Sequence, residues 1–142
     1  MTITTVKKDL FTVPQGYYLA HCISADFALG AGIAKAFDTV YNMRHKLFKD
    51  RPNYVYNGGD AILIDNVFNL VTKAKYWHKP TYDSLRKSLE MMREHLEFMD
   101  VTKLAMPTLG CGLDRLQWMK VKNIIEDVFA DTDVDIVVCV LE

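Results

Sequence analysis

Short runs of β-prone apolar residues alternate along this chain with segments of helical periodicity. The β-prone runs cover residues 3–6, 17–24, 61–64, 67–72, 102–106 and 134–141, and helical spacing of apolar residues covers 33–47, 81–99 and 116–129. Such alternation is typical of an α/β layered fold. The turn-forming pair Asp65-Asn66 separates two of the runs and predicts a β-hairpin. We therefore expect the α/β fold class, with six strands in one mixed sheet and three helices.

The length and composition of the chain limit the number of domains and the classes of partner that we expect. With 142 residues, half of them apolar, the chain can bury one core, and we expect a single domain over residues 1–142. The formal net charge of −1 offers no basic excess for holding a nucleic-acid backbone. Cys22, Cys111 and Cys139 lack the spacing of a disulfide framework or a structural zinc site. The sequence shows neither a signal-peptide pattern nor a membrane-spanning run, so we expect a cytoplasmic protein without membrane association.

Three features that can carry chemistry each follow a predicted strand. Gly30 and Gly32 come after the second run, Lys73 comes after the fourth, and a Gly-Cys-Gly loop at residues 110–112 comes after the fifth. Ligands of open α/β sheets bind beyond the carboxyl ends of the strands. The chain order therefore predicts that these three features share one rim of the sheet.

Two glycine-rich segments, residues 30–34 and 108–114, each precede a predicted helix. Glycine lets backbone N–H groups approach an anion closely, and the N-terminus of a helix favours negative charge. A phosphate or diphosphate is the expected ligand, and two loops on one rim could hold both phosphates from opposite sides. The first segment alone is equally explained as a tight turn that binds nothing, because it is neither a dinucleotide-binding nor a Walker A motif.

A basic cluster of Lys73, Lys75 and Lys79 follows the fourth run. A neutral lysine is a nucleophile, and neighbouring cations favour the neutral form. Lys73 is the best-placed candidate because it lies directly at the strand end. The alternative interpretation is a solvated basic loop with no chemical role.

Asp114, Cys111 and His21 each have a structural explanation beside a functional one. Asp114 and Gln117 have the spacing of a capping box at a helix start, whereas the functional interpretation places the Asp114 carboxylate at the mouth of the anion site. Cys111 could be a nucleophile, but a small, weakly polar loop residue is the favoured interpretation. His21 is interpreted as a core or rim histidine and not as a general base.

Several segments match one protein family together and in order along nearly the whole chain. They are Ala20-His21-Cys22-Ile23-Ser24, Gly30-Ala31-Gly32-Ile33-Ala34, His78-Lys79-Pro80-Thr81-Tyr82, Met106-Pro107 and Gly110-Cys111-Gly112-Leu113-Asp114-Arg115-Leu116-Gln117-Trp118. On these residues the chain resembles the macro domain family and, more narrowly, its terminal ADP-ribose protein glycohydrolase branch. The resemblance implies a three-layer α/β/α macro domain with a mixed six-stranded sheet. It also implies ADP-ribose in a cleft on one rim, without a metal or another cofactor.

The resemblance further implies a covalent mechanism. In that branch a lysine at a strand end attacks the anomeric carbon of the distal ribose, and an aspartate resolves the lysyl–ADP-ribose adduct. The matching catalytic positions are Lys73 and Asp114. The positions implied to bind ADP-ribose are Asp9, Leu10, His21, Ser24, Gly30, Ala31, Gly32, Ile33, Thr108, Leu109, Gly110, Cys111, Gly112 and Leu113. The implied activity is hydrolysis of ADP-ribosyl esters on acidic side chains, with O-acetyl-ADP-ribose as a further ester substrate.

Other functions stay open on the sequence alone. A non-catalytic ADP-ribose reader would use the same cleft, and a hydrolase could instead act on ADP-ribosylated nucleic acid or on ADP-ribose 1″-phosphate. The near-zero net charge argues against a long nucleic-acid footprint, so nucleic acid is expected only as a modified substrate. We expect a monomer whose partner is ADP-ribose or an ADP-ribosylated protein.

Overall fold

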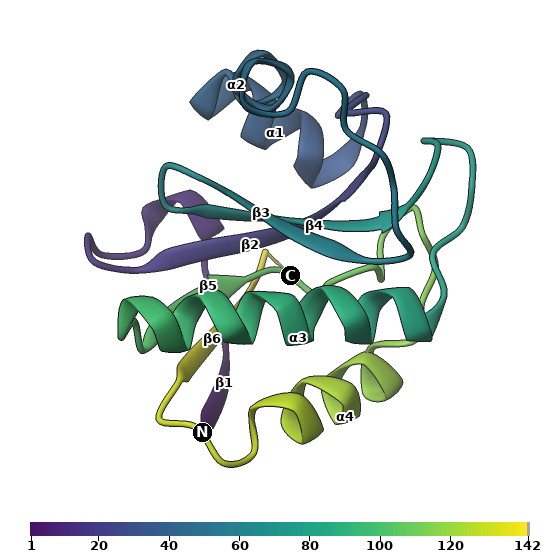
Figure 1. The fold of residues 1–142 in the computed structure, drawn as a ribbon. Helices are drawn as coiled ribbons and strands as arrows, with labels where there is room; N and C mark the ends of the chain where they lie inside the picture. Colours follow the sequence, from purple (N-terminus) through teal and green to yellow (C-terminus); the bar gives the residue numbers. More distant parts are fainter. Residues whose placement is uncertain (142) are drawn as a thin grey trace.

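Six strands form one mixed sheet in the order β1-β6-β5-β2-β4-β3 in the computed structural model, which describes residues 1–141 (Figure 1). The strands are β1 (Thr2–Lys7), β2 (Tyr18–Ser24), β3 (Asp60–Ile64), β4 (Val67–Lys73), β5 (Lys103–Met106) and β6 (Asp135–Val140). The helices are α1 (Gly32–Tyr41), α2 (Met43–Asp50), α3 (Tyr82–Met99) and α4 (Trp118–Phe129), with a short 3-10 helix η1 (Leu10–Thr12). All neighbouring strands are parallel except the pair β3 and β4. The predicted α/β fold class and mixed sheet are confirmed.

The sheet separates two apolar cores, one under each pair of helices. In Figure 1, α1 and α2 lie on one side of the sheet, and α3 and α4 lie on the other. Strand β4 serves both cores because its side chains alternate: Val67 and Val71 pack with α1 and α2, whereas Phe68 and Leu70 pack with α3 and α4. This continuous apolar run is typical of a strand that is covered on both faces. The predicted three-layer α/β/α arrangement is confirmed.

The hairpin and the third helix follow their local sequence signals. Ile64 and Val67 pair across the Asp65-Asn66 turn, and Asp65 has a φ of 53°, which a short polar side chain tolerates. Helix α3 begins with a capping box in which the side chains of Thr81 and Ser84 each bind the other's backbone N–H. The predicted hairpin and the predicted helix over residues 81–99 are confirmed, and the capping box is a finding of the structure. No helix within residues 1–141 is long and apolar enough to cross a membrane.

The prediction of a single helix over residues 33–47 is wrong, because the chain forms two helices there. Asn42 lies between α1 and α2 with a left-handed backbone, at a φ of 56°. Asparagine adopts this conformation at little cost. Phe37 before the break and Leu47 after it are both fully buried against the sheet, so the apolar spacing continues across the break.

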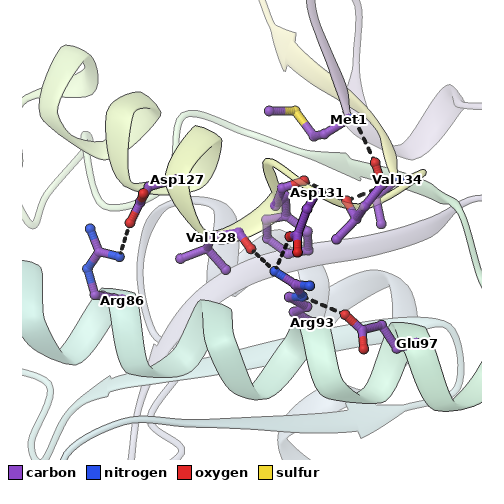
Figure 2. Close-up of polar contacts among 10 residues, drawn as sticks. Met1, Arg86, Arg93, Glu97, Asp127, Val128, Asp131 and Val134 are labelled. Carbon is purple, nitrogen blue, oxygen red and sulfur yellow. Dashed lines mark hydrogen bonds and ion pairs between the residues drawn. The ribbon is translucent and has the colours of Figure 1, made fainter.

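Arg93 connects α3 to the last turn of α4, its neighbour on the same side of the sheet (Figure 2). Its guanidinium donates to the carbonyl oxygen of Val128 at 2.6 Å and forms ion pairs with Glu97 and Asp131. The last carbonyls of a helix lack partners within the helix, so a charged donor stabilises this end.

Replacing Arg93 with methionine is expected to lower the free energy of unfolding by about 1–3 kcal/mol, because the Val128 carbonyl then loses its charged donor. The measurement is urea denaturation followed by circular dichroism. Arg86→Met is the matched control, since the ion pair of Arg86 with Asp127 lies at the surface and should contribute less than about 1 kcal/mol. Equal losses in the two variants would contradict the role of Arg93 at the end of α4.

Candidate active site

The carboxyl ends of three neighbouring parallel strands meet at one rim of the sheet. Strand β2 pairs with β4 on one side and with β5 on the other, and all three run in the same direction. The loops that follow them are β2–α1, β4–α3 and β5–α4. The glycine pair lies where the first loop meets α1, Lys75 and Lys79 lie in the second loop directly after Lys73 at the end of β4, and the Gly-Cys-Gly segment lies in the third loop. The shared rim that the chain order predicted is confirmed.

These loops enclose a cleft of about 810 Å³. The lining residues are Cys22, Ile23, Ser24, Ala28, Leu29, Gly30, Ala31, Gly32, Ile33, Ala34, Lys73, Tyr76, Lys79, Pro107, Thr108, Leu109, Gly110, Gly112, Leu113 and Asp114. Its volume lies in the range of small-molecule sites, about 300–1,000 Å³. Within the described residues 1–141, no group of three histidine, cysteine or acidic side chains could hold a metal ion. The polar groups that line this cleft are backbone groups of the loops and a few charged side chains.

The β2–α1 loop presents backbone N–H groups at one wall of the cleft. Helix α1 begins at Gly32, where φ is 60°, and its N-cap residue Ala31 has no side chain that could satisfy the first N–H groups. Phe27 and Leu29, ahead of the glycine pair, have φ values of 53° and 43°, and both side chains are buried. Bulky residues rarely adopt this conformation, so the surrounding packing must impose it. The loop therefore places the N-terminus of α1, whose first N–H groups have no side-chain cap, at the cleft, which is the kind of position that favours an anion.

The β5–α4 loop forms the opposite wall. Gly110 has a φ of 71°, and a Cβ atom there would lie 2.7 Å from Cδ1 of Leu116. The N–H of Leu116 donates to the carbonyl of Gly110, which tightens the loop. Leu113 reaches across the cleft, with its Cδ1 atom 3.7 Å from the Cβ position of Gly32 in the other loop. The two glycine-rich loops therefore approach each other over the cleft.

The interpretation of Asp114 as the residue that caps the start of a helix is wrong. Helix α4 begins at Trp118 with Gln117 as its N-cap residue, and Arg115, at a φ of 61°, turns the chain directly after Asp114. The carboxylate of Asp114 therefore caps no helix. It accepts a hydrogen bond from Nζ of Lys73 at 2.6 Å instead.

Lys73 and Asp114 form an ion pair inside the cleft. Lys73 is the last residue of β4, and its carbonyl accepts the N–H of Ala25 at 2.9 Å. Both side chains of the pair are largely buried, with 14% exposure for Lys73 and 15% for Asp114. Lys79 donates to the carbonyl of Leu113 at 2.9 Å, next to Asp114 in the chain. The pair thus joins the end of β4 to the β5–α4 loop, between two residues that are 41 positions apart in sequence.

The two cysteines near the pair are in environments that keep their thiols protonated. Burial raises the pKa of the Cys22 thiol to about 12, and the nearby Asp114 carboxylate adds to this rise. Burial also raises the pKa of Cys111, whose Sγ donates weakly to the carbonyl of Leu109 at 3.3 Å. A thiol is a poor nucleophile when it stays protonated. The interpretation of Cys111 as a loop residue fits this environment.

The structure places four of the expected ligand-binding residues outside the cleft lining. His21 is fully buried, where it stacks on Phe37 and shares a 2.6 Å hydrogen bond between its Nε2 and the Asn69 side-chain oxygen. Burial lowers the pKa of His21 to about 4, although the Asn69 hydrogen bond opposes this shift. His21 is therefore a neutral core histidine.

The other three residues outside the lining lie in or beside η1 and in the β5–α4 loop. Asp9 caps η1 by accepting the N–H of Phe11 at 3.0 Å. Leu10 is buried in the core under α1, and Cys111 packs against the core under α3 and α4. Contact of these residues with a ligand stays a prediction.

Tyr76 is a cleft residue that sequence reasoning did not select. It lies three residues beyond Lys73, and 62% of it is exposed although it lines the cleft. Its only sequence signal is its position inside the basic cluster, between Lys75 and Lys79.

Comparison with known proteins gives a consistent set of relatives. No family model matches the chain. The chain is 46% identical to ADP-ribose glycohydrolase OARD1 of Bos taurus and 45% identical to the protein of that name from Homo sapiens, and each match covers 98% of this chain and 91% of the relative. The macrodomain of Mycobacterium tuberculosis DarG superimposes with a TM-score of 0.86 at 21% identity, covering 97% of both chains. Thermosipho africanus DarTG in complex with ADP-ribose gives a TM-score of 0.73 at 18% identity, covering 97% of this chain and 41% of that one.

Proposed function

The chain belongs to the ADP-ribose glycohydrolase branch of the macrodomain family, and from this premise we propose that it hydrolyses the ester bond between ADP-ribose and an acidic side chain of a protein. The observation that carries the proposal is the 2.6 Å contact between Lys73 and Asp114 inside the cleft. A domain that only binds ADP-ribose has no chemical use for a largely buried amine and carboxylate at one point of its cleft. The pair therefore favours a hydrolase over a reader.

The two glycine-rich loops supply the binding site in this proposal. The diphosphate of ADP-ribose lies between the N-terminus of α1 and the loop from Thr108 to Leu113. Backbone N–H groups and the helix dipole stabilise its charge. The distal ribose then points toward Lys73, which lines the same cleft.

In the first step, Asp114 acts as a base. Its carboxylate takes a proton from the ammonium of Lys73, and the neutral amine attacks the anomeric carbon of the distal ribose. A carbon–nitrogen bond forms while the bond between that carbon and the ester oxygen breaks. The acidic side chain leaves as a carboxylate, which needs no proton at neutral pH because an unperturbed glutamate or aspartate has a pKa of about 4.

In the second step, water replaces Lys73 on the anomeric carbon. The carbon–nitrogen bond breaks, a carbon–oxygen bond to water forms, and the electron pair returns to Nζ. One proton of the water enters the solvent in the net reaction, and Asp114 returns its proton to the lysine. The pair is restored, and free ADP-ribose leaves. Acetate is also a carboxylate leaving group, so O-acetyl-ADP-ribose fits the same two steps.

The proposal is tested by incubating the protein with a panel of ADP-ribosylated substrates. We expect release of ADP-ribose from a glutamate-linked peptide and from O-acetyl-ADP-ribose. A serine-linked peptide should stay intact, because its alkoxide is a far poorer leaving group than a carboxylate. ADP-ribosylated DNA and ADP-ribose 1″-phosphate complete the panel. Tight binding of ADP-ribose without turnover of any of these compounds would contradict the hydrolase and support the reader.

A further inference from the structure

The carboxylate of Asp26 joins two loops of the cleft wall. One oxygen accepts the hydroxyl of Ser24 and the N–H of Ala28, both in or next to the β2–α1 loop. The other oxygen accepts the N–H of Tyr76 at 3.0 Å, from the β4–α3 loop 50 residues away. Ser24, Ala28 and Tyr76 all line the cleft, whereas Asp26 is not one of its lining residues.

Asp26 is held in its charged form by these contacts. Burial by itself would raise the pKa of the Asp26 carboxyl, but the hydrogen bonds from Ser24, Tyr76 and Ala28 outweigh burial and lower it below its usual value. Hydrogen bonds to an ionised acceptor are stronger than neutral ones. The contact with Tyr76 is therefore a charge-assisted link between the two loops.

The same carboxylate supports the strained part of the β2–α1 loop. Phe27 and Leu29 have left-handed backbones, and Ala28 between them donates its N–H to Asp26 at 3.2 Å. Such a backbone persists only where its surroundings determine it. In addition, the Ser24 hydroxyl donates its hydrogen to Asp26. The Ser24 oxygen can therefore only accept hydrogen bonds from a ligand in the cleft.

We propose that Asp26 is a positioning residue for ligand binding. Its carboxylate holds the β2–α1 loop and the β4–α3 loop at the spacing that ADP-ribose requires. This inference rests on the proposed function. The ion pair of Lys73 and Asp114 is supported separately, by the strand position of Lys73 and by the β5–α4 loop. Loss of the Asp26 link should therefore weaken binding and leave the chemical steps intact.

Asp26→Asn removes the link selectively. An asparagine oxygen can still accept from Ser24 and Ala28, but its NH₂ group then faces the N–H of Tyr76, and two donors repel each other. Asp65→Asn is the matched control, because Asp65 lies in the β3–β4 turn, where its carboxylate pairs with Lys46 at the surface. Its left-handed backbone suits asparagine equally well.

The experiment measures the Kd for ADP-ribose by calorimetry, KM and kcat for a glutamate-linked peptide, and hydrogen exchange of the Tyr76 amide. For Asp26→Asn we expect Kd and KM to rise about tenfold, the loss of roughly one charge-assisted hydrogen bond, and kcat to change less than about twofold. The Tyr76 amide should exchange faster than in the wild type. Asp65→Asn should match the wild type in all four quantities.

An unchanged Kd for ADP-ribose in Asp26→Asn would overturn the inference, as would a loss of kcat at constant Kd. Exchange of the wild-type Tyr76 amide tests the link without any substitution, so a poorly folded variant does not remove the test: an unprotected amide would also overturn it. If the wild type binds ADP-ribose but turns over no substrate, the proposed function fails, while the comparison of Kd values still decides the role of Asp26.

Discussion

Replacement of Lys73 with alanine is expected to lower turnover of a glutamate-linked ADP-ribosyl peptide by more than about a thousandfold, because the attacking amine is removed. Binding of ADP-ribose should persist, since the backbone groups of both glycine-rich loops are unchanged. The measurement pairs steady-state release of ADP-ribose with calorimetric titration of free ADP-ribose. Loss of the ion pair also leaves Asp114 without its partner, so the Kd need not match the wild type closely.

The control for this variant is Lys49→Ala. Lys49 is an exposed lysine in the last turn of α2 and does not line the cleft, so its removal should leave turnover within about twofold of the wild type. Full activity of Lys73→Ala would exclude the covalent mechanism and point to direct attack by water. A loss of binding as large as the loss of turnover would instead assign Lys73 to ligand recognition.

The second large effect is expected for Asp114→Asn. Asparagine has nearly the same shape, but it can neither take the proton of Lys73 nor return it. Loss of a general acid–base group lowers turnover by about 10²–10⁴-fold. Bulk solvent can deprotonate Lys73 at raised pH, whereas departure of the lysine from the anomeric carbon inside the cleft depends on the proton that Asp114 returns to it. The lysyl adduct should therefore accumulate in this variant.

Mass spectrometry of the intact protein and of its peptides detects the adduct. We expect the mass of one ADP-ribosyl group on the peptide that contains Lys73, increasing with the pH of the incubation. The double variant Lys73→Ala/Asp114→Asn should carry no adduct, which locates the bond to Lys73 and not to the neighbouring Lys75 or Lys79. Wild-type turnover by Asp114→Asn would remove Asp114 from the mechanism.

The clearest sequence predictions concern elements whose signals are local. The apolar spacing over residues 81–99 predicted α3, and the turn at Asp65 joins two adjacent strands. The break between α1 and α2 at Asn42 could not be predicted from the apolar pattern. Phe37 and Leu47 pack in the same core on either side of it, so the apolar spacing continues across the break.

The site was predictable as a set of positions but not as an arrangement. The order of strands and loops placed Lys73 and the two glycine-rich loops on one rim, because parallel strands end at the same edge. Local pattern was misleading at Asp114, where the spacing to Gln117 suggested a helix cap. The link from Asp26 to Tyr76 has no sequence signal, because its two halves are 50 residues apart.

By itself, then, the sequence determined the alternation of strands and helices, the mixed sheet and the rim on which chemistry could occur, since periodicity and turn residues act over a few positions. Only the tertiary structure decided which side chains meet. Pairing of β2 with both β4 and β5 brings Lys73 to Asp114. Burial makes His21 a neutral core residue, because water is excluded on all sides of its ring. Distances between charges and exclusion of water depend on packing between distant segments, and no local pattern encodes either of them.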